Sequence, residues 1–204
     1  MSASLIFDDA FEPSPVDLDR DVVIVGSGSL ADVVPEDAGL CATHCAIMHT
    51  RSRWRILDLY SRQGTRLNGK SVADAILRSG DRIKLGKISA VFETTESEPP
   101  AKAGPIELQI GGGERWSLES DSALIGSWAG CDIVVEGAEA AQVLVVNAHG
   151  GAVARAIGEA GVVIVNGRTS DGCALLDGDV LQVGEERFTV RAPHLPRRSD
   201  GEPM

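Results

Sequence analysis

The sequence has no apolar run long enough to cross a membrane. A membrane-spanning helix needs about 20 consecutive apolar residues, and the N-terminal run is only Leu5-Ile6-Phe7. No basic segment precedes that run, so we expect no signal peptide. These absences predict a soluble, cytoplasmic protein without a membrane partner. The 15 arginines against 4 lysines hint at a GC-rich bacterial genome.

Cysteine is also scarce, and helical periodicity is missing. Four cysteines in 204 residues are too few for a disulfide framework, and we expect them to be thiols in a reducing compartment. No window shows a sustained period of 3.6 residues, the pattern typical of an amphipathic helix. The sequence therefore favours an all-β protein.

Basic residues are few outside one segment. The net charge is −11, which disfavours general binding to nucleic acid because such binding requires Lys and Arg to neutralise phosphates. Residues 51–87 nevertheless carry ten basic and three acidic side chains. This segment is interpreted either as a solvated strand face that discourages aggregation or as a surface for an acidic ligand.

What the sequence does contain is a series of short strands separated by turns. Trp54 and Ile56 alternate with arginines, as in a half-buried strand, and residues 61–64 supply turn chemistry. We predict that a return strand at residues 65–67 completes a β-hairpin with it. Asn68-Gly69 is the dipeptide that tolerates positive φ in a second, primed turn.

The chain contains two copies of one unit. Ile24-Val25-Gly26-Ser27 returns 100 positions later as Leu124-Ile125-Gly126-Ser127. With an offset of 98, Asn68-Gly69 aligns with Asn166-Gly167, and the downstream Gly-Asp and Gly positions align as well. We predict a domain at residues 1–93, a proline-rich linker at 94–105, a second domain at 106–191 and a disordered tail at 192–204.

Three patterns in the first copy look like cofactor, metal or catalytic motifs, but we do not interpret them as such. The G-S-G-S-L-A after residue 25 looks like a dinucleotide fingerprint, but Pro35 and Gly39 leave no room for the required helix. The C-x-x-H-C-x-x-x-H at 41–49 would not hold zinc on a strand, where residues four apart lie about 13 Å apart. A Cys41–His44 nucleophile and base would lack an orienting partner and an oxyanion hole. We expect no enzyme activity, no metal and no cofactor.

The ordered motifs of the first copy resemble a forkhead-associated (FHA) domain over about residues 4–93. The second copy resembles the same family more distantly, through I-G-S, C-D-I-V-V, V-N-G and L-L-D-G-D-V-L-Q-V-G. The motifs of the first copy that carry the resemblance are Gly26-Ser27, Cys41-Ala42-Thr43-His44, residues 58–65, Asn68-Gly69, Gly80-Asp81 and Leu85-Gly86.

The resemblance implies two tandem FHA-like antiparallel β-sandwiches, each of eleven strands, whose loops at one end bind phosphothreonine peptides without catalysis. Three positions depart from the family pattern. Ser27 stands where the family has an arginine, Cys41 where it has a phosphate-contacting serine, and Gln63 where it has an asparagine. Losing the arginine should weaken phosphate binding about ten- to a hundredfold.

The remaining matched residues have mostly structural roles under this resemblance. His44 would brace the loops, Asn68 would contact a peptide backbone, and three glycines would permit the turns. Arg62 could replace the missing charge from a neighbouring position. The candidate peptide-binding residues are Ser27, Cys41, His44, Arg62, Gln63 and Asn68, and the turn glycines are Gly26, Gly64 and Gly69.

Two interpretations of function stay open. One is a protein-interaction adaptor that does not depend on phosphate; the other is phosphothreonine recognition by the first domain through Arg62. In the second copy, Ser127 again replaces the arginine, and the serine and histidine positions fall near Ala140 and Val143. We therefore expect no phosphate site there, and a role in packing or in binding an unmodified protein.

Overall fold

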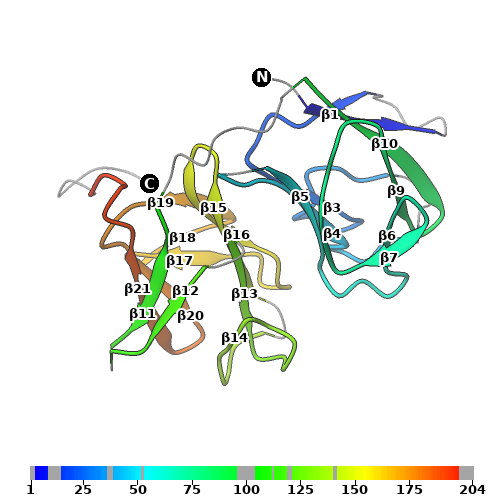
Figure 1. Cartoon of the computed structure of the whole chain (residues 1–204). Helices are drawn as coiled ribbons and strands as arrows, with labels where there is room; N and C mark the ends of the chain where they lie inside the picture. The colour runs from blue at the N-terminus through cyan, green and yellow to red at the C-terminus, as the bar shows by residue number, and fades with distance from the viewer. Residues whose placement is uncertain are drawn as a thin grey trace. The chain divides into compact units, whose positions relative to one another are not determined.

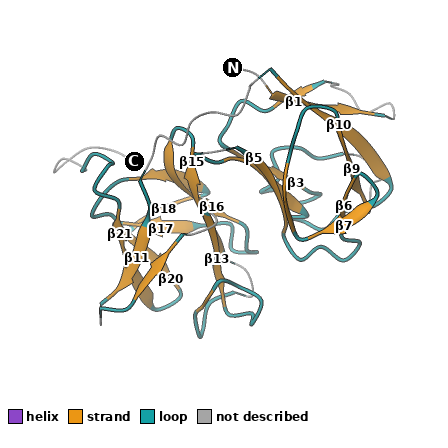
Figure 2. Ribbon diagram, viewed as in Figure 1, coloured by secondary structure: helices purple, strands orange, loops and turns teal. Residues whose placement is uncertain are grey.

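The computed structural model describes residues 3–8, 15–35, 39–51, 53–95, 104–111, 113–118, 121–139 and 142–197. The chain divides into two units, residues 1–100 and 101–204 (Figure 1). Within the described ranges every regular element is a β-strand, and loops join the strands (Figure 2). The predicted all-β class is confirmed.

The first unit is built from two sheets. One sheet has the strand order β2-β1-β10-β9-β6-β7 and the other β3-β4-β5-β8, and all neighbouring strands are antiparallel. The strands are β1 (Ala3–Phe7), β2 (Val16–Asp17), β3 (Val22–Val25), β4 (Cys45–His49), β5 (Trp54–Asp58), β6 (Thr65–Leu67), β7 (Lys70–Val72), β8 (Asp74–Ile76), β9 (Asp81–Leu85) and β10 (Ile88–Thr94).

The core of the first unit lies between these sheets. Leu5 and Phe92 from the first sheet join one apolar cluster with Ile47 and Ile56 from the second, and all four are almost fully buried. On β9, Ile83 faces this core while the residues on either side of it do not, as its alternating sequence predicts. Burial of the apolar face is what holds the two sheets together.

The second unit repeats the arrangement. Its sheets have the orders β12-β11-β21-β20-β17-β18 and β14-β13-β15-β16-β19. The strands are β11 (Glu107–Ile110), β12 (Arg115–Ser117), β13 (Ser122–Gly126), β14 (Ile133–Val134), β15 (Val143–Ala148), β16 (Gly151–Ala156), β17 (Val163–Val165), β18 (Arg168–Ser170), β19 (Gly172–Leu175), β20 (Val180–Val183) and β21 (Glu186–Arg191).

The predicted repeat is visible in individual hydrogen bonds. Asp32 accepts the Ile24 N–H at 2.8 Å, and Asp132 accepts the Leu124 N–H at the same distance. The second unit has eleven strands among the described residues and the first has ten. The difference is β14, whose place in the first unit is taken by a single parallel bridge between Val25 and Val33.

The predicted hairpin at residues 54–67 is wrong. β5 pairs with β4 and β8, whereas β6 pairs with β7 and β9 in the other sheet. The intervening loop is therefore a crossover between sheets. The second predicted turn is confirmed, because Asn68 and Gly69 have φ of 50° and 83° and join β6 to β7.

Two predicted boundaries also shift. Thr94, assigned to the linker, ends β10 and pairs with Ala3; residues 96–103 of the linker lie outside the described residues. The expected disorder of the tail is wrong for residues 192–197. The buried Ala192 donates its N–H to Asp177, which also accepts the Arg197 Nε–H, both at 2.9 Å. Residues 198–204 lie outside the described part of the chain.

Candidate functional site

The candidate site of the first unit is formed by three loops: residues 26–31 after β3, residues 39–44 before β4 and residues 59–64 after β5. The first two loops are joined by backbone hydrogen bonds. Ser27 donates its N–H to the Cys41 carbonyl and Gly28 donates to Ala42, both at 2.9 Å. A Cβ on Gly26 would overlap the Ala42 carbonyl oxygen, so this approach requires glycine.

The side chains of Ser27 and Cys41 are used in loop-to-loop contacts. Ser27 Oγ donates to the Leu40 carbonyl at 2.9 Å. The Cys41 thiol accepts the backbone N–H of Arg62 at 3.2 Å, which links the second loop to the third. Neither residue supplies a positive charge, and both stabilise the loop arrangement.

His44 connects the second loop to the third through its buried side chain. Its ring is fully buried; Nδ1 accepts the Cys41 N–H, and Nε2 lies 3.4 Å from the Gly64 carbonyl. Burial lowers the pKa of His44. A neutral ring with its proton on Nε2 satisfies both contacts, since Nδ1 is then an acceptor and Nε2 a donor.

Asp58 organises the third loop and was missed in the sequence. Its carboxylate accepts the Ser61 N–H at 3.0 Å, the Ser61 hydroxyl at 2.6 Å and the Thr65 hydroxyl at 2.7 Å. The signal was the pattern D-x-x-S-x-x-x-T, since Asp side chains commonly bond to groups a few residues ahead in turns. These bonds turn the chain from one sheet to the other.

The surface of the third loop carries Tyr60, Arg62 and Gln63. All three are exposed, and within the described residues the Arg62 side chain makes no hydrogen bond or ion pair. Tyr60 is 48% exposed with φ of 57°. As an exposed aromatic beside the candidate residues it is a further potential contact that sequence reasoning overlooked.

Asn68 lies apart from these loops and is engaged within the domain. Its Nδ2 donates to Asp81 Oδ1 at 2.7 Å, and its Oδ1 accepts the Arg82 N–H at 2.9 Å. Asn166 of the second unit makes the same two bonds, to Asp179 and to Val180. The repeated contacts give Asn68 a structural role in the β6–β7 turn.

The second unit shows which residues replace Cys41 and His44. The Ser127 N–H donates to the Glu139 carbonyl at 2.8 Å, and the Gln142 N–H donates to Ile125 at 2.9 Å. These are the bonds made by Ser27 with Cys41 and by His44 with Val25 in the first unit. In the sequence alignment of the two copies, the serine and histidine positions of the second copy fall near Ala140 and Val143. The structure puts them one residue earlier, at Glu139 and Gln142.

Glu139 and Gln142 reproduce the loop contacts with different chemistry. Gln142 Oε1 accepts the Glu139 N–H at 3.3 Å, as His44 Nδ1 accepts the Cys41 N–H. Glu139 Oε1 accepts the Ala160 N–H at 2.8 Å, as the Cys41 thiol accepts that of Arg62. The corresponding end of the second unit thus presents a carboxylate.

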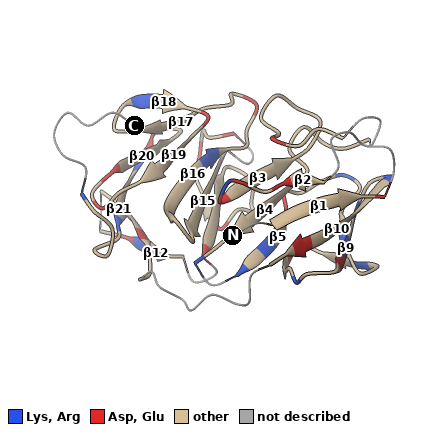
Figure 3. Cartoon of the chain, turned by 90° about the horizontal axis from the view of Figure 1, so that it is seen from above, with Lys and Arg blue, Asp and Glu red and all other residues tan. Residues whose placement is uncertain are grey.

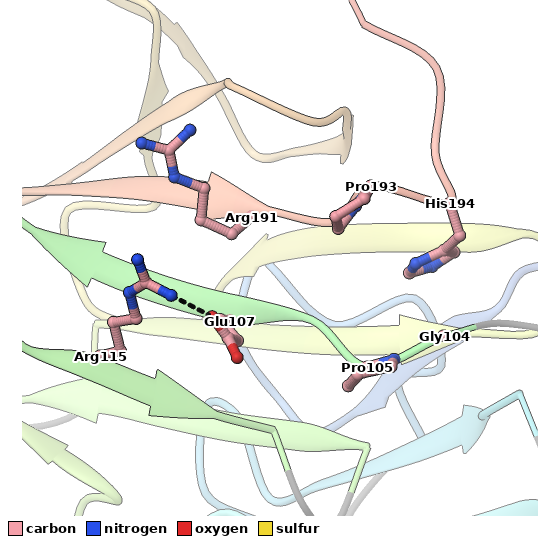
Figure 4. Close-up of a pocket in the computed structure, with 7 residues that line it drawn as sticks. All are labelled: Gly104, Pro105, Glu107, Arg115, Arg191, Pro193 and His194. Carbon is pink, nitrogen blue, oxygen red and sulfur yellow. Dashed lines mark hydrogen bonds and ion pairs between the residues drawn. The ribbon is translucent and has the colours of Figure 1, made fainter.

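A separate pocket of about 430 Å³ lies where β11 begins and β21 ends (Figure 4). Within it, Arg115 and Glu107 form an ion pair, with Nη1 of Arg115 lying 3.5 Å from Oε2 of Glu107. Figure 4 shows Pro105 and His194 on the other side of the pocket. It shares no residue with the loop end of either unit.

The described residues contain no group of three or more His, Cys, Asp or Glu side chains that could hold a metal ion. The cysteine and histidine of the zinc-like pattern, Cys45 and His49, lie at the two ends of strand β4. No described helix is long and apolar enough to span a membrane.

Comparison with known proteins identifies relatives of part of the chain. Residues 14–96 match the family described as the inner membrane component of T3SS, cytoplasmic domain. The glycogen accumulation regulator GarA of Mycobacterium tuberculosis is 27% identical over 77 residues, which are 38% of this chain and 48% of GarA. The chain spans about half the length of the curated relatives it matches.

Solved FHA domains are also similar. One, from a study of phosphothreonine-dependent FHA domain interactions, is 27% identical with a TM-score of 0.44, covering 48% of this chain and 100% of that domain. The FHA domain of CT664 from Chlamydia trachomatis is 24% identical with a TM-score of 0.43, covering 47% and 100% respectively. The family-model match lies within the N-terminal unit, and GarA and these solved FHA domains are proteins to which part of the chain is similar.

Proposed function

We propose that this chain is a non-catalytic protein-interaction adaptor whose first unit binds a protein segment at its loop end without requiring phosphorylation. The observation that carries the proposal is how the side chains of Ser27 and Cys41 are engaged within the domain. Their side chains bond to Leu40 and to the Arg62 backbone, and neither is charged. The loop end therefore offers a braced surface without the family's phosphate-binding arginine and serine.

Phosphate recognition demands a different set of groups. A phosphothreonine carries a charge of about −1.5 to −2 and is best held by an arginine fork with short hydroxyl and amide donors. Charge-assisted hydrogen bonds contribute roughly 1.5 to 3 kcal/mol each, so their loss weakens binding by about tenfold or more. A ligand recognised through loop shape and backbone groups loses nothing when the phosphate is absent.

The second unit supports the same function by a different route. Glu139 places a carboxylate on the Ala160 N–H at its loop end. A phosphate approaching that position would meet a like charge and would have to displace an existing hydrogen bond. The second unit accordingly serves as a packing module or binds unmodified protein.

One observation favours a second candidate function. Arg62 is exposed beside Cys41, and its guanidinium has no hydrogen bond or ion pair within the described part of the chain. It could contact a phosphothreonine from the third loop and replace the charge missing at Ser27. This alternative makes the first unit a phosphothreonine reader with an arginine in a new position.

A peptide library with paired phosphorylated and unphosphorylated threonine separates the two functions. The wild-type chain should bind its best sequences with equal affinity in both forms, within about threefold. The variant Arg62→Ala should match wild type, and Arg78→Ala, an exposed arginine on another loop, is its matched control. A phosphate preference above about tenfold that Arg62→Ala alone removes would establish the alternative instead.

A gain-of-function variant tests the explanation itself. Restoring the family residues with Ser27→Arg and Cys41→Ser should create a phosphate preference, because the loop frame around them is intact. The result expected is a shift of at least about tenfold toward the phosphorylated peptides. An unchanged preference in a folded double variant would show that those two positions do not decide phosphate dependence.

A further inference from the structure

The outer face of the first sheet in unit 1 carries an unusual pair of cations. Arg66 on β6 and Lys84 on β9 are direct partners in the antiparallel ladder, and both are exposed. Side chains at such positions have Cβ atoms about 4.5–5.5 Å apart, and like charges there are destabilising. Neither side chain makes a hydrogen bond or ion pair within the described residues.

Three other cations on the first unit each have an anionic partner nearby. Arg82, the second exposed cation of β9, pairs with Asp8 at 2.8 Å. Arg20 pairs with Asp32 at 2.8 Å, and Arg55 pairs with Asp74. Arg66 and Lys84 differ from these three, because they form a cross-strand positive pair without an anionic partner among the described residues, in a chain of net charge −11. Figure 3 colours the basic residues blue and the acidic residues red along these strands.

An apolar patch adjoins the cations on the same face. Ile6 on β1 is 42% exposed and lies opposite Val91 on β10, which in turn lies opposite Arg82 on β9. Side chains alternate across a strand, so Ile6, Val91, Lys84 and Arg66 all point away from the core. The face therefore combines unpaired positive charge with exposed apolar surface.

The second unit lacks this combination. The positions that match Arg66 and Lys84 at the repeat offset of 98 are Ile164 and Gln182, which are also opposite each other in their ladder. The position that matches Ile6 in the corresponding ladder row is Gln109, opposite Thr189. The fold does not require the positive and apolar side chains, because the repeated sheet forms without them.

We propose that this outer face, defined by Ile6, Arg66, Lys84 and Val91, is a second interaction surface that binds an acidic protein segment containing an apolar residue. Charge complementarity selects the occupant: acidic side chains neutralise Arg66 and Lys84, and the apolar residue covers Ile6 and Val91. The surface is distinct from the loop end, so it binds independently of the function proposed above. A bound acidic segment also relieves the repulsion between the two cations.

The test uses the full chain and a fluorescent glutamate-rich peptide with a central leucine. We expect binding at low ionic strength that weakens as salt is raised, because exposed charges are screened. The double variant Arg66→Thr, Lys84→Thr should lower affinity about tenfold. The matched control Arg168→Thr, Arg187→Thr removes two exposed cations from the second unit and should bind as wild type does.

Three further measurements make the outcome decisive. Ile6→Ser should weaken binding of the leucine peptide and leave that of an all-polar acidic peptide unchanged. The double variant should melt at or above the wild-type temperature, because it removes a like-charge pair and threonine suits a strand. The proposal would be overturned if both double variants bound the peptide equally, or if the variant Arg66→Thr, Lys84→Thr failed to fold. It would also be overturned if the wild-type chain bound duplex DNA or anionic vesicles more tightly than the peptide.

Discussion

Asn68 donates its side-chain amide to Asp81 at 2.7 Å, and the bond is repeated by Asn166 and Asp179 at the same distance. In both units the asparagine begins a turn with φ near 50°. The same contact fixes the same β-turn twice, although Asp179 is almost fully buried and Asp81 is only half-buried. The two copies therefore offer a matched comparison of one interaction at two depths.

Replacing each asparagine with glycine should show that depth dependence. Glycine tolerates the positive φ, so the change isolates the side-chain bonds. We expect Asn68→Gly to lower the free energy of unfolding of the first unit by about 1 kcal/mol. Asn166→Gly should lower that of the second unit by about 2 kcal/mol or more, since a buried carboxylate loses one of its hydrogen-bond donors. Denaturant titration followed by NMR of each unit measures both; equal costs would contradict the burial argument.

Gly26 should tolerate no side chain. A Cβ there would overlap the Ala42 carbonyl oxygen, and the two backbones cannot separate without breaking the Ser27–Cys41 hydrogen bond. Gly26→Ala is expected to cost more than about 3 kcal/mol of stability. Gly111→Ala, where a Cβ meets open space, is the control and should change the melting temperature little.

The stability of the first unit should fall in mild acid because of His44. Burial lowers the pKa of His44 below its usual value of 6.5, so the unfolded chain takes up a proton first as the pH falls. The contribution is fully present above pH 6.5 and is lost progressively below it, until the folded-state pKa is reached.

His44→Gln isolates that contribution. Gln142 occupies the equivalent position in the second unit and accepts the same backbone N–H, so glutamine keeps the brace without titrating. The unfolding free energy of this variant should depend less steeply on pH than that of wild type between neutral pH and about pH 5. Parallel curves for the two proteins would show that His44 does not titrate on unfolding.

Asp177 should decide whether the chain after β21 stays attached. Its pKa is lowered by the Ala192 N–H and by Arg197, so its stabilising effect is present above its usual pKa and is lost as the pH falls through the lowered value. Asp177→Ala should speed trypsin cleavage after Arg191 and Arg197 and cost about 2 kcal/mol. Glu186→Gln, an exposed acid on β21, should leave the cleavage rate unchanged.

The strands and most turns of this protein could be predicted from short stretches of sequence. Ile83 and Leu85 face the core because residues two apart on a strand point the same way, and Asn68-Gly69 turns because both residues accept positive φ. Internal similarity also predicted the second unit, whose sheet orders repeat those of the first. Whether the candidate residues bind a peptide stays a prediction.

The errors arose where the answer depended on distant parts of the chain. Residues 54–67 look like a hairpin, but β5 and β6 pair within different sheets, and Asp58 turns the loop between them. Residues 192–197 look too polar to be ordered, yet Asp177 holds them through two hydrogen bonds. Composition alone does not register such a partner.

The sequence by itself determined that this chain is two all-β units. That Ser27, Cys41 and Gln63 stand where the FHA family has phosphate contacts is implied by the resemblance and stays a prediction. Only the tertiary structure decided that Cys41 joins Arg62, that His44 links two loops, and that Arg66 faces Lys84 across a ladder. The physical reason is that alternation and turn preference act over a few residues, whereas pairing and side-chain contacts follow from packing between segments far apart in the chain.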